Sequence, residues 1–164
     1  IALRAAAVTR DIARWIEIDA RIEAITLARE LREGSRRAGA SLLGVHERIG
    51  TAGAADYRQA MRTGDALGHL GMVQGIVWRG GGMNETAIEA ASAHTFCVGL
   101  LGAAIRLGVI GHLHAQRGLL ALRPIIEAIL SEPVGDLDDM YANTFATEIA
   151  SMRHESHGAR LFAN

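Results

Sequence analysis

Apolar residues recur along the chain at spacings of three and four, which is the period of an α-helix. Residues 4–33 contain neither Pro nor Gly. Four apolar residues in this stretch would share one helical face: Trp15, Ile18, Ile22 and Ile25. The pattern predicts one or two long helices that reach about His46, followed by a loop at 50–53.

Glycines and N-cap residues divide the middle of the chain into further helices. A short helix is expected from Ala54 to about Arg62. Asp65 is the predicted N-cap of the next helix, which Gly80–Gly82 ends. Asn84 is the predicted N-cap of a long helix that reaches about residue 107.

The long helix after Asn84 is rich in small residues, including Ala87, Ala91, Gly99 and Ala103. Small residues let two helix axes approach closely. We therefore interpret this helix as a core helix or a subunit-contact helix.

The last third of the chain predicts two more helices. Gly108–Gly111 breaks the pattern, and the next helix contains Pro124, which predicts a kink or break near Arg123. An acidic loop, residues 132–139, is expected to be solvated. Thr144 is the predicted cap of a last short helix to about residue 153, and the tail from His157 has no helical period.

No strand-like alternation, hairpin signal or internal repeat is present. The expected fold is all-α, a single helical bundle-like domain of about six to eight helices over residues 1–164. The chain starts at Ile1 with a helical pattern already running, which we interpret as a truncation.

Charge and composition exclude several classes of protein. The formal net charge is −1, which predicts binding neither to nucleic acid nor to an anionic membrane. The most apolar window, Phe96 to Ile105, is about half the length of a membrane span. Cys97 is the single cysteine, so a buried, inert thiol in a reducing compartment is expected.

The histidines and nucleophiles form no catalytic pattern. His112 and His114 would point about 200° apart on a helix, and His154 and His157 would share a face but lack further ligands. Cys97 lacks an electropositive setting, and no nucleophile elbow or phosphate loop is present. We predict no metal site and no enzymatic activity.

The segment 30–37 is densely charged. Arg32 and Arg36 are like charges at i,i+4, which repel each other mildly unless a partner offsets them. A solvated helix face and an acidic partner surface are both open interpretations.

Three segments resemble the UreF family of urease accessory proteins. They are R-E-L-R-E-G-S-R at 29–36, a stretch from Gly102 to Pro124, and I-A-S-M-R-H-E with a following R-L-F at 149–162. Their order and spacing resemble the family pattern over essentially the whole chain. Val109 stands where the family usually has Pro, and His112 where it has Gln. The family's N-terminal segment is missing.

The resemblance implies an all-helical adaptor in the cytoplasm that needs no cofactor of its own. Members of the family dimerise, bind UreD (also called UreH) and recruit the GTPase UreG, which brings nickel to apo-urease. A homodimer is therefore expected for the full-length form, with nickel handled by the partner proteins.

The resemblance also assigns contact residues. The side facing the GTPase would contain Arg106, Gly111 and His112. The side facing UreD would contain Arg153, His154, Glu155, Arg160, Leu161 and Phe162. The charged helix would contribute Arg29, Glu30, Arg32 and Arg36. Two alternatives stay open, namely an all-helical ligand-binding domain of a regulator and an enzyme with a histidine-ligated metal.

Overall fold

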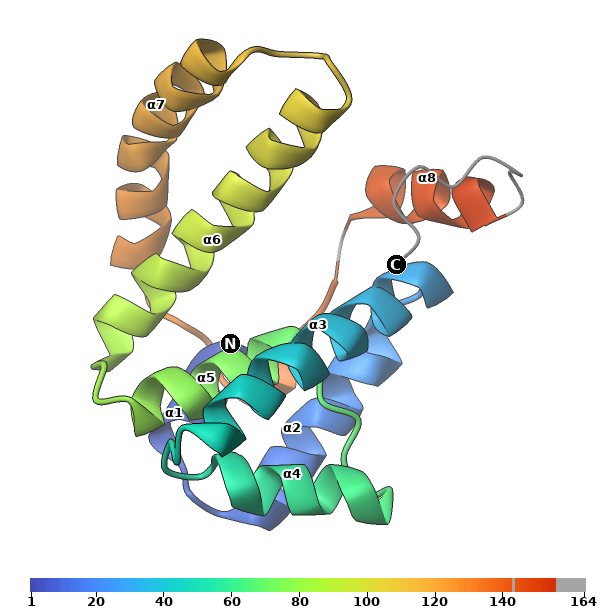
Figure 1. The fold of residues 1–164 in the computed structure, drawn as a ribbon, viewed down its shortest axis with the longest axis vertical. Helices are drawn as coiled ribbons and strands as arrows, with labels where there is room; N and C mark the ends of the chain where they lie inside the picture. Colours follow the sequence, from blue (N-terminus) through green and yellow to red (C-terminus); the bar gives the residue numbers. More distant parts are fainter. Residues whose placement is uncertain (143, 156–164) are drawn as a thin grey trace.

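The computed structural model describes residues 1–142 and 144–155, which form eight α-helices, one 3-10 helix and no strand. The elements are α1 (Ala2–Val8), α2 (Ile12–Ile25), α3 (Arg29–Arg48), α4 (Ala54–Thr63), α5 (Leu70–Gly80), α6 (Glu85–Arg106), α7 (His112–Ser131), η1 (Leu137–Asp139) and α8 (Phe145–Glu155). Helices α1 to α5 form a base, from which α6 and α7 extend as a hairpin (Figure 1). The predicted all-α class and number of helices are confirmed.

The first part of the chain forms three helices, so the prediction of one or two long helices is wrong. The Asp11 carboxylate accepts the Ala13 N–H at 3.0 Å and starts α2. The Thr26 hydroxyl donates to the Ile22 carbonyl at 2.8 Å, where α2 ends. These short polar side chains compete with the helical hydrogen bonds of the backbone, which explains the two breaks.

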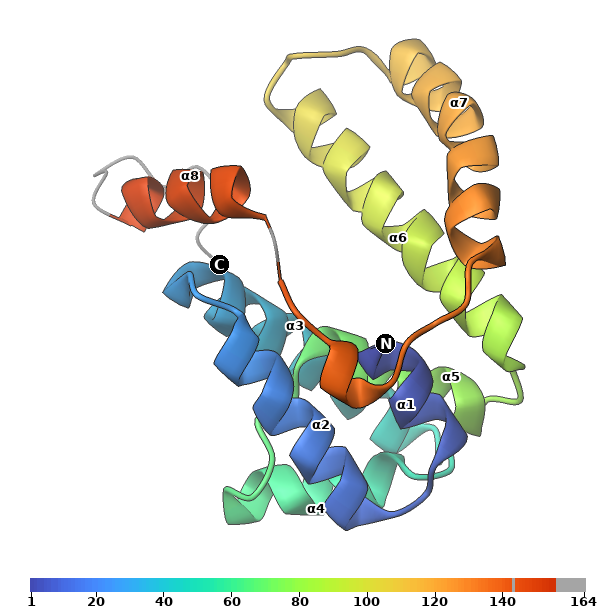
Figure 2. The same cartoon turned by 180° about the vertical axis from the view of Figure 1, so that it is seen from behind.

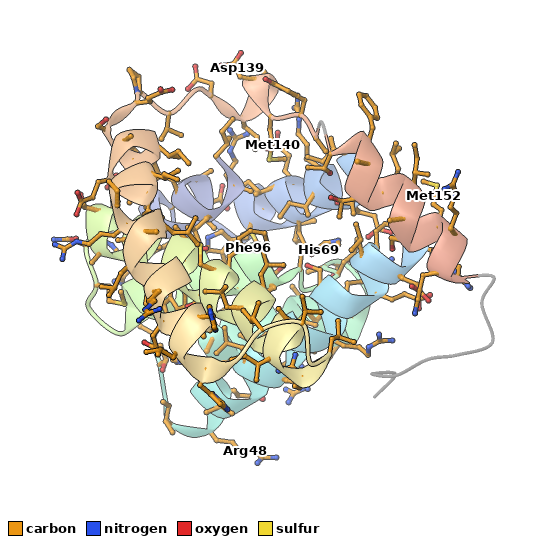
Figure 3. All side chains as sticks on the ribbon, turned by 90° about the horizontal axis from the view of Figure 1, so that it is seen from above. Arg48, His69, Phe96, Asp139, Met140 and Met152 are labelled. Carbon is orange, nitrogen blue, oxygen red and sulfur yellow. The ribbon has the colours of Figure 1, made fainter. Side chains whose placement is uncertain are left out.

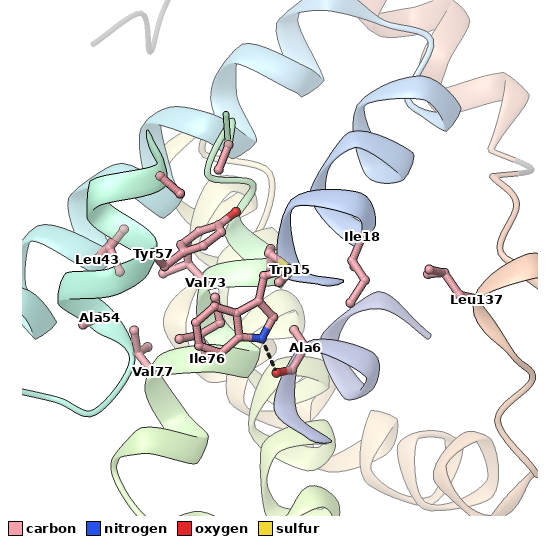
Figure 4. Packing of buried hydrophobic residues seen from close by; sticks show 13 residues of the cluster. Ala6, Trp15, Ile18, Leu43, Ala54, Tyr57, Val73, Ile76, Val77 and Leu137 are labelled. Atoms are coloured by element: carbon pink, nitrogen blue, oxygen red, sulfur yellow. Dashed lines mark hydrogen bonds between the residues drawn. The ribbon is translucent and has the colours of Figure 1, made fainter. Parts of the chain in front are cut away.

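The hydrophobic core lies between helices α1 to α5. Trp15 and Tyr57 pack edge to face with ring centroids 5.9 Å apart, a geometry worth about 0.5–1.5 kcal/mol beyond the area it buries. The Trp15 Nε1–H donates to the Ala6 carbonyl at 3.0 Å (Figure 4). Leu137 of η1 also enters this core. The acidic loop is therefore anchored on the base and is not wholly solvated.

The loop before α5 is held by a carboxylate from α2. Asp19 is fully buried and accepts the backbone N–H groups of Leu67, Gly68 and His69 at 2.5, 2.8 and 3.0 Å. Helix α5 begins only after these residues. Asp65, the predicted N-cap, instead accepts the Thr63 hydroxyl, so that prediction is wrong. A carboxylate distant in sequence supplies the hydrogen bonds that a local cap would have made.

Close helix approaches occur in the base and not along α6. A Cβ at Gly75 of α5 would collide with the Leu3 carbonyl of α1, and a Cβ at Gly39 of α3 would collide with the Gly68 carbonyl. By contrast, Gly99 of α6 has nothing within 4 Å. Within the described part of the chain α6 is therefore not a core helix.

Helix α7 continues through Pro124, so of the predicted kink or break the break is absent, and the kink stays a prediction. A proline removes one backbone hydrogen bond and crowds the preceding turn, which bends a helix more often than it ends one. An ion pair between Arg123 Nε and Glu127 Oε1, 2.9 Å apart, spans the proline. The predicted boundaries at Asn84 and Gly108 are confirmed, since Asn84 accepts the Ala87 N–H at 2.9 Å.

Candidate partner-binding site

The two charged segments predicted separately at 29–36 and 153–155 meet in the structure. The C-terminal end of α8 lies against the N-terminal end of α3 (Figure 1). Glu155 Oε1 accepts the Glu30 N–H at 3.1 Å, and its Oε2 lies 3.7 Å from Arg29 Nε. His154 Nδ1 lies 2.9 Å from Glu30 Oε2. We refer to Arg29, Glu30, His154 and Glu155 as the α3–α8 junction.

The backbone explains why a carboxylate settles at this end of α3. The first N–H groups of a helix have no partner within the helix, and the N-cap Ala28 has no side chain to offer one. The positive end of the helix dipole also favours an anion. Glu155 satisfies both requirements from 125 residues away along the chain.

The arginines Arg32 and Arg36 point toward α2 and are paired within the chain. Arg36 Nη2 and Arg32 Nε lie 2.6 and 3.2 Å from Glu23 Oε1. Arg32 Nη1 also donates to the carbonyls of Thr26 and Leu27 at 2.7 Å each. Glu23 therefore supplies the opposite charge that offsets the repulsion between these two arginines. Contact of either arginine with another protein stays a prediction.

Glu23 also links this charged cluster to a buried histidine that sequence reasoning missed. Its Oε2 lies 2.8 Å from His69 Nε2, and His69 Nδ1 lies 3.2 Å from Ser35 Oγ. Ser35 Oγ accepts the Leu70 N–H at 3.1 Å. His69 is 1% exposed and lies in the interior (Figure 3). No short-range spacing connects Glu23 to His69, so the sequence carried no signal for this contact.

The buried phenol of Tyr57 lies beside the Asp19 carboxylate. Burial raises the pKa of Tyr57 well above its ordinary value near 10, and the negative charge of Asp19 raises it further. Within the described residues the Tyr57 hydroxyl has no geometrically acceptable hydrogen-bond partner. The phenol is therefore held neutral in a nearly dry setting.

The residues predicted to face the GTPase gather at the free end of the α6–α7 hairpin. Arg106 ends α6, Gly111 is the N-cap of α7, and His112 is its first residue. All three are exposed, and so are Leu107 and Val109 beside them. In Figure 2 this end of the hairpin lies beyond the N-terminal end of α8, whereas the α3–α8 junction lies at the opposite, C-terminal end of α8. The chain thus presents two separate candidate surfaces.

The α6–α7 hairpin exposes much apolar surface. Its large exposed apolar residues are Phe96, Val98, Leu100, Leu107, Val109, Leu113, Leu120, Ile125 and Ile129. An open groove of about 380 Å³ runs between the two helices. Cys97, predicted to be buried, is only partly buried. Surfaces of this kind mark contacts with other molecules.

Helix α6 is the one helix in the described part of the chain that is long and apolar enough to cross a membrane by length and composition. The apolar helix is longer than the window from Phe96 to Ile105, because α6 begins at Glu85. A core helix can satisfy the same two criteria, but such a helix is mostly buried, whereas only 6% of the window of α6 that satisfies them is buried in the described structure.

The C-terminal residues predicted to bind UreD are described only in part. Arg153 and His154 are exposed and Glu155 is partly buried. Arg160, Leu161, Phe162 and His157 lie outside the described residues. Among the described residues, no group of three or more His, Cys, Asp or Glu side chains could hold a metal ion.

The fold and these surfaces define an all-helical protein with two exposed candidate contact surfaces. The sequence model of the UreF family matches residues 1–123, and the chain belongs to that family. A urease accessory protein UreF from Arthrobacter is 33% identical over 151 residues, covering 90% of this chain and 67% of the relative. The regulator alternative is therefore set aside.

Two further relatives bear the same name. The UreF of Trichodesmium erythraeum is 43% identical over 84 residues, covering 51% of this chain and 36% of that protein. The UreF of Actinobacillus pleuropneumoniae serotype 3 is 29% identical over 154 residues, covering 93% and 68%. The full-length alignments thus span about two thirds of the relatives. No solved structure gives a significant match.

Proposed function

We propose that this chain acts in urease maturation as a non-enzymatic adaptor in the cytoplasm. Its C-terminal region binds UreD (UreH), and the free end of its α6–α7 hairpin binds the GTPase UreG. The partners carry nickel to apo-urease, and the adaptor uses no cofactor of its own. Family membership and the separation of the two candidate surfaces support this proposal (Figure 2).

The observation that carries the proposal is the exposed apolar surface of the hairpin. Val109 is 72% exposed and Leu113 is 62% exposed at the end that also holds Arg106 and His112. Apolar side chains surrounded by arginine and histidine are typical of interface cores with polar rims. The same hairpin offers the surface for the homodimer that we propose for the full-length form.

Co-purification with UreD and with UreG tests the two contacts separately. Val109→Asp places a charge in the proposed UreG surface and is expected to abolish UreG capture while UreD capture persists. Ile49→Asp is the matched control, because Ile49 is 69% exposed at the far end of α3. Equal UreG capture by wild type and Val109→Asp would show that the assignment of the hairpin is wrong.

Deletion of residues 158–164 tests the other surface. The shortened chain is expected to lose UreD capture, to keep its helical circular dichroism spectrum, and to unfold at an unchanged temperature. UreD capture that survives this deletion would contradict the proposed role of the C-terminal segment.

A further inference from the structure

Helix α8 exposes its apolar side chains and buries a carboxylate, which is the reverse of an ordinary surface helix. Phe145, Ile149 and Met152 recur at helical spacing and are 63%, 50% and 43% exposed. The one buried residue of α8 is Glu148, whose carboxylate accepts the Thr144 hydroxyl. Surface helices normally place the apolar stripe against the core. The contact between α8 and the base therefore does not depend on burial of this stripe.

Polar groups make the contact between α8 and α3. The Glu155 carboxylate caps the Glu30 N–H, His154 lies against the Glu30 carboxylate, and Arg29 lies 3.7 Å from Glu155. The carboxylates of Glu30 and Glu155 are about three quarters buried, whereas Arg29 and His154 are at least half exposed. Ion pairs with an exposed partner are weak and are screened by salt.

We propose that α8 is a releasable arm and that the α3–α8 junction is the latch that holds it closed. Opening costs little hydrophobic energy, because the apolar stripe of α8 already faces water in the closed arrangement. The closed latch occupies His154 and Glu155 and fixes where the chain leaves residue 155. On the proposed function, UreD must therefore break the latch when it takes up this end of the chain.

The test measures the arm in the isolated chain. Spin labels are placed at Ser41→Cys on α3 and Met152→Cys on α8, in a Cys97→Ser background, and the distance distribution between them is recorded by pulsed electron resonance. Neither labelled residue belongs to the latch. At low salt we expect a narrow, short-distance population. Raising the salt from about 0.01 M to about 1 M shortens the screening length tenfold and should move the population to longer, broader distances.

Substitutions test the latch without a change in salt concentration. Glu155→Ala and Glu30→Gln should each open the arm at low salt, while the helical circular dichroism signal stays the same. The double variant Glu30→Gln with His154→Ala should open it no further than Glu30→Gln alone, because the two side chains form one contact. Glu33→Ala is the control, since Glu33 pairs with Arg37 on the same helix, with 4.0 Å between Nη1 and Oε2.

A distance distribution that stays narrow in high salt and in both latch variants would overturn the proposal. A titration with UreD then separates the latch from the proposed function. Added UreD is expected to move the low-salt distance distribution of the spin-labelled chain, with its latch residues intact, to the same longer and broader distances that high salt produces. If the arm opens as described but the chain never binds UreD, the latch proposal is supported and the proposed function is contradicted.

Discussion

Helices α5 and α6 are both apolar, yet the chain buries one and leaves the other exposed. Six of the 11 residues of α5 are buried, whereas in α6 only Ile88 of 22 is buried. The difference lies in what surrounds each helix. Helix α5 is packed by α1 and α3 and also contacts α2, α4 and α6, while α6 packs mainly on α7 and meets α1 and α5 near its start (Figure 1).

An apolar helix can therefore serve either as part of the core or as an exposed surface. The apolar residues of α5 form the core of this chain. The apolar residues of α6 form a surface that the rest of this chain leaves largely uncovered. Such a surface is expected for a protein that works through contacts. Substitutions in the base should therefore lower the free energy of unfolding, and matched substitutions in the hairpin should change partner binding instead.

The largest expected effect is at the buried carboxylate below α5. Asp19→Ala leaves the N–H groups of residues 67–69 without their acceptor, and each buried unsatisfied group costs about 1–3 kcal/mol. We expect a loss of about 3–5 kcal/mol in the free energy of unfolding, measured by urea denaturation. Asp65→Ala is the control and should change it by less than about 0.5 kcal/mol. Equal losses at Asp65 and Asp19 would restore the local-cap interpretation.

The next effect compares α5 and α6 directly. Ile76→Ala removes a side chain that is 2% exposed and should cost about 2–4 kcal/mol through lost burial and a cavity. Leu100→Ala removes one that is 57% exposed and should cost less than about 0.5 kcal/mol in the isolated chain. Thermal and urea unfolding of both variants check this. A large loss at Leu100 would mean that the isolated chain already covers α6, for example by dimerising.

The features that could be predicted from the sequence depend on neighbouring residues. Asn84 caps the helix that follows it, Gly80–Gly82 ends the helix before it, and Gly108 lies in the left-handed region with φ +71° after α6. In each case the side chain or the glycine acts on the backbone within a few residues. Such local chemistry is readable in one sequence.

The features that could not be predicted depend on residues far apart in the chain. Asp19 replaces the local cap at Asp65, Glu155 caps α3, and Glu23 pairs with Arg32 and Arg36. A single sequence specifies that a cap or a counter-ion is needed but not which distant residue provides it. The candidate site was therefore predicted as separate segments, and only the structure joined two of them.

Glycine substitutions give a smaller effect of opposite sign in the two regions. Gly75→Ala places a Cβ against the Leu3 carbonyl and 2.8 Å from the Ala6 Cβ, so we expect a loss of about 1–3 kcal/mol as α1 and α5 separate. Gly99→Ala meets open space and should gain up to about 1 kcal/mol, because alanine favours a helix. Thermal unfolding checks both. Destabilisation by Gly99→Ala would indicate a close helix contact at α6 in the isolated chain.

The smallest effect at neutral pH is expected at Tyr57, and it grows with pH. Tyr57→Phe removes a hydroxyl without a hydrogen-bond partner among the described residues, so unfolding at pH 7 should change by less than about 1 kcal/mol. The folded-state pKa of Tyr57 is raised above its ordinary value of 10.0, so the unfolded chain loses this proton first. Wild-type stability should therefore be intact below pH 10 and fall above it, by about 1.4 kcal/mol per pH unit from this group.

Tyr57→Phe should lack this part of the alkaline loss, because phenylalanine has no proton to release. Urea unfolding at several pH values above 10 measures the difference in slope between the variant and the wild type. Tyr141→Phe is the control, since Tyr141 is 79% exposed and its substitution should leave the slope unchanged. An identical slope in wild type and Tyr57→Phe would mean that the phenol ionises alike in both states. Water would then reach the Tyr57 hydroxyl in the folded chain, and the contrast between a dry base and a solvated hairpin would be wrong.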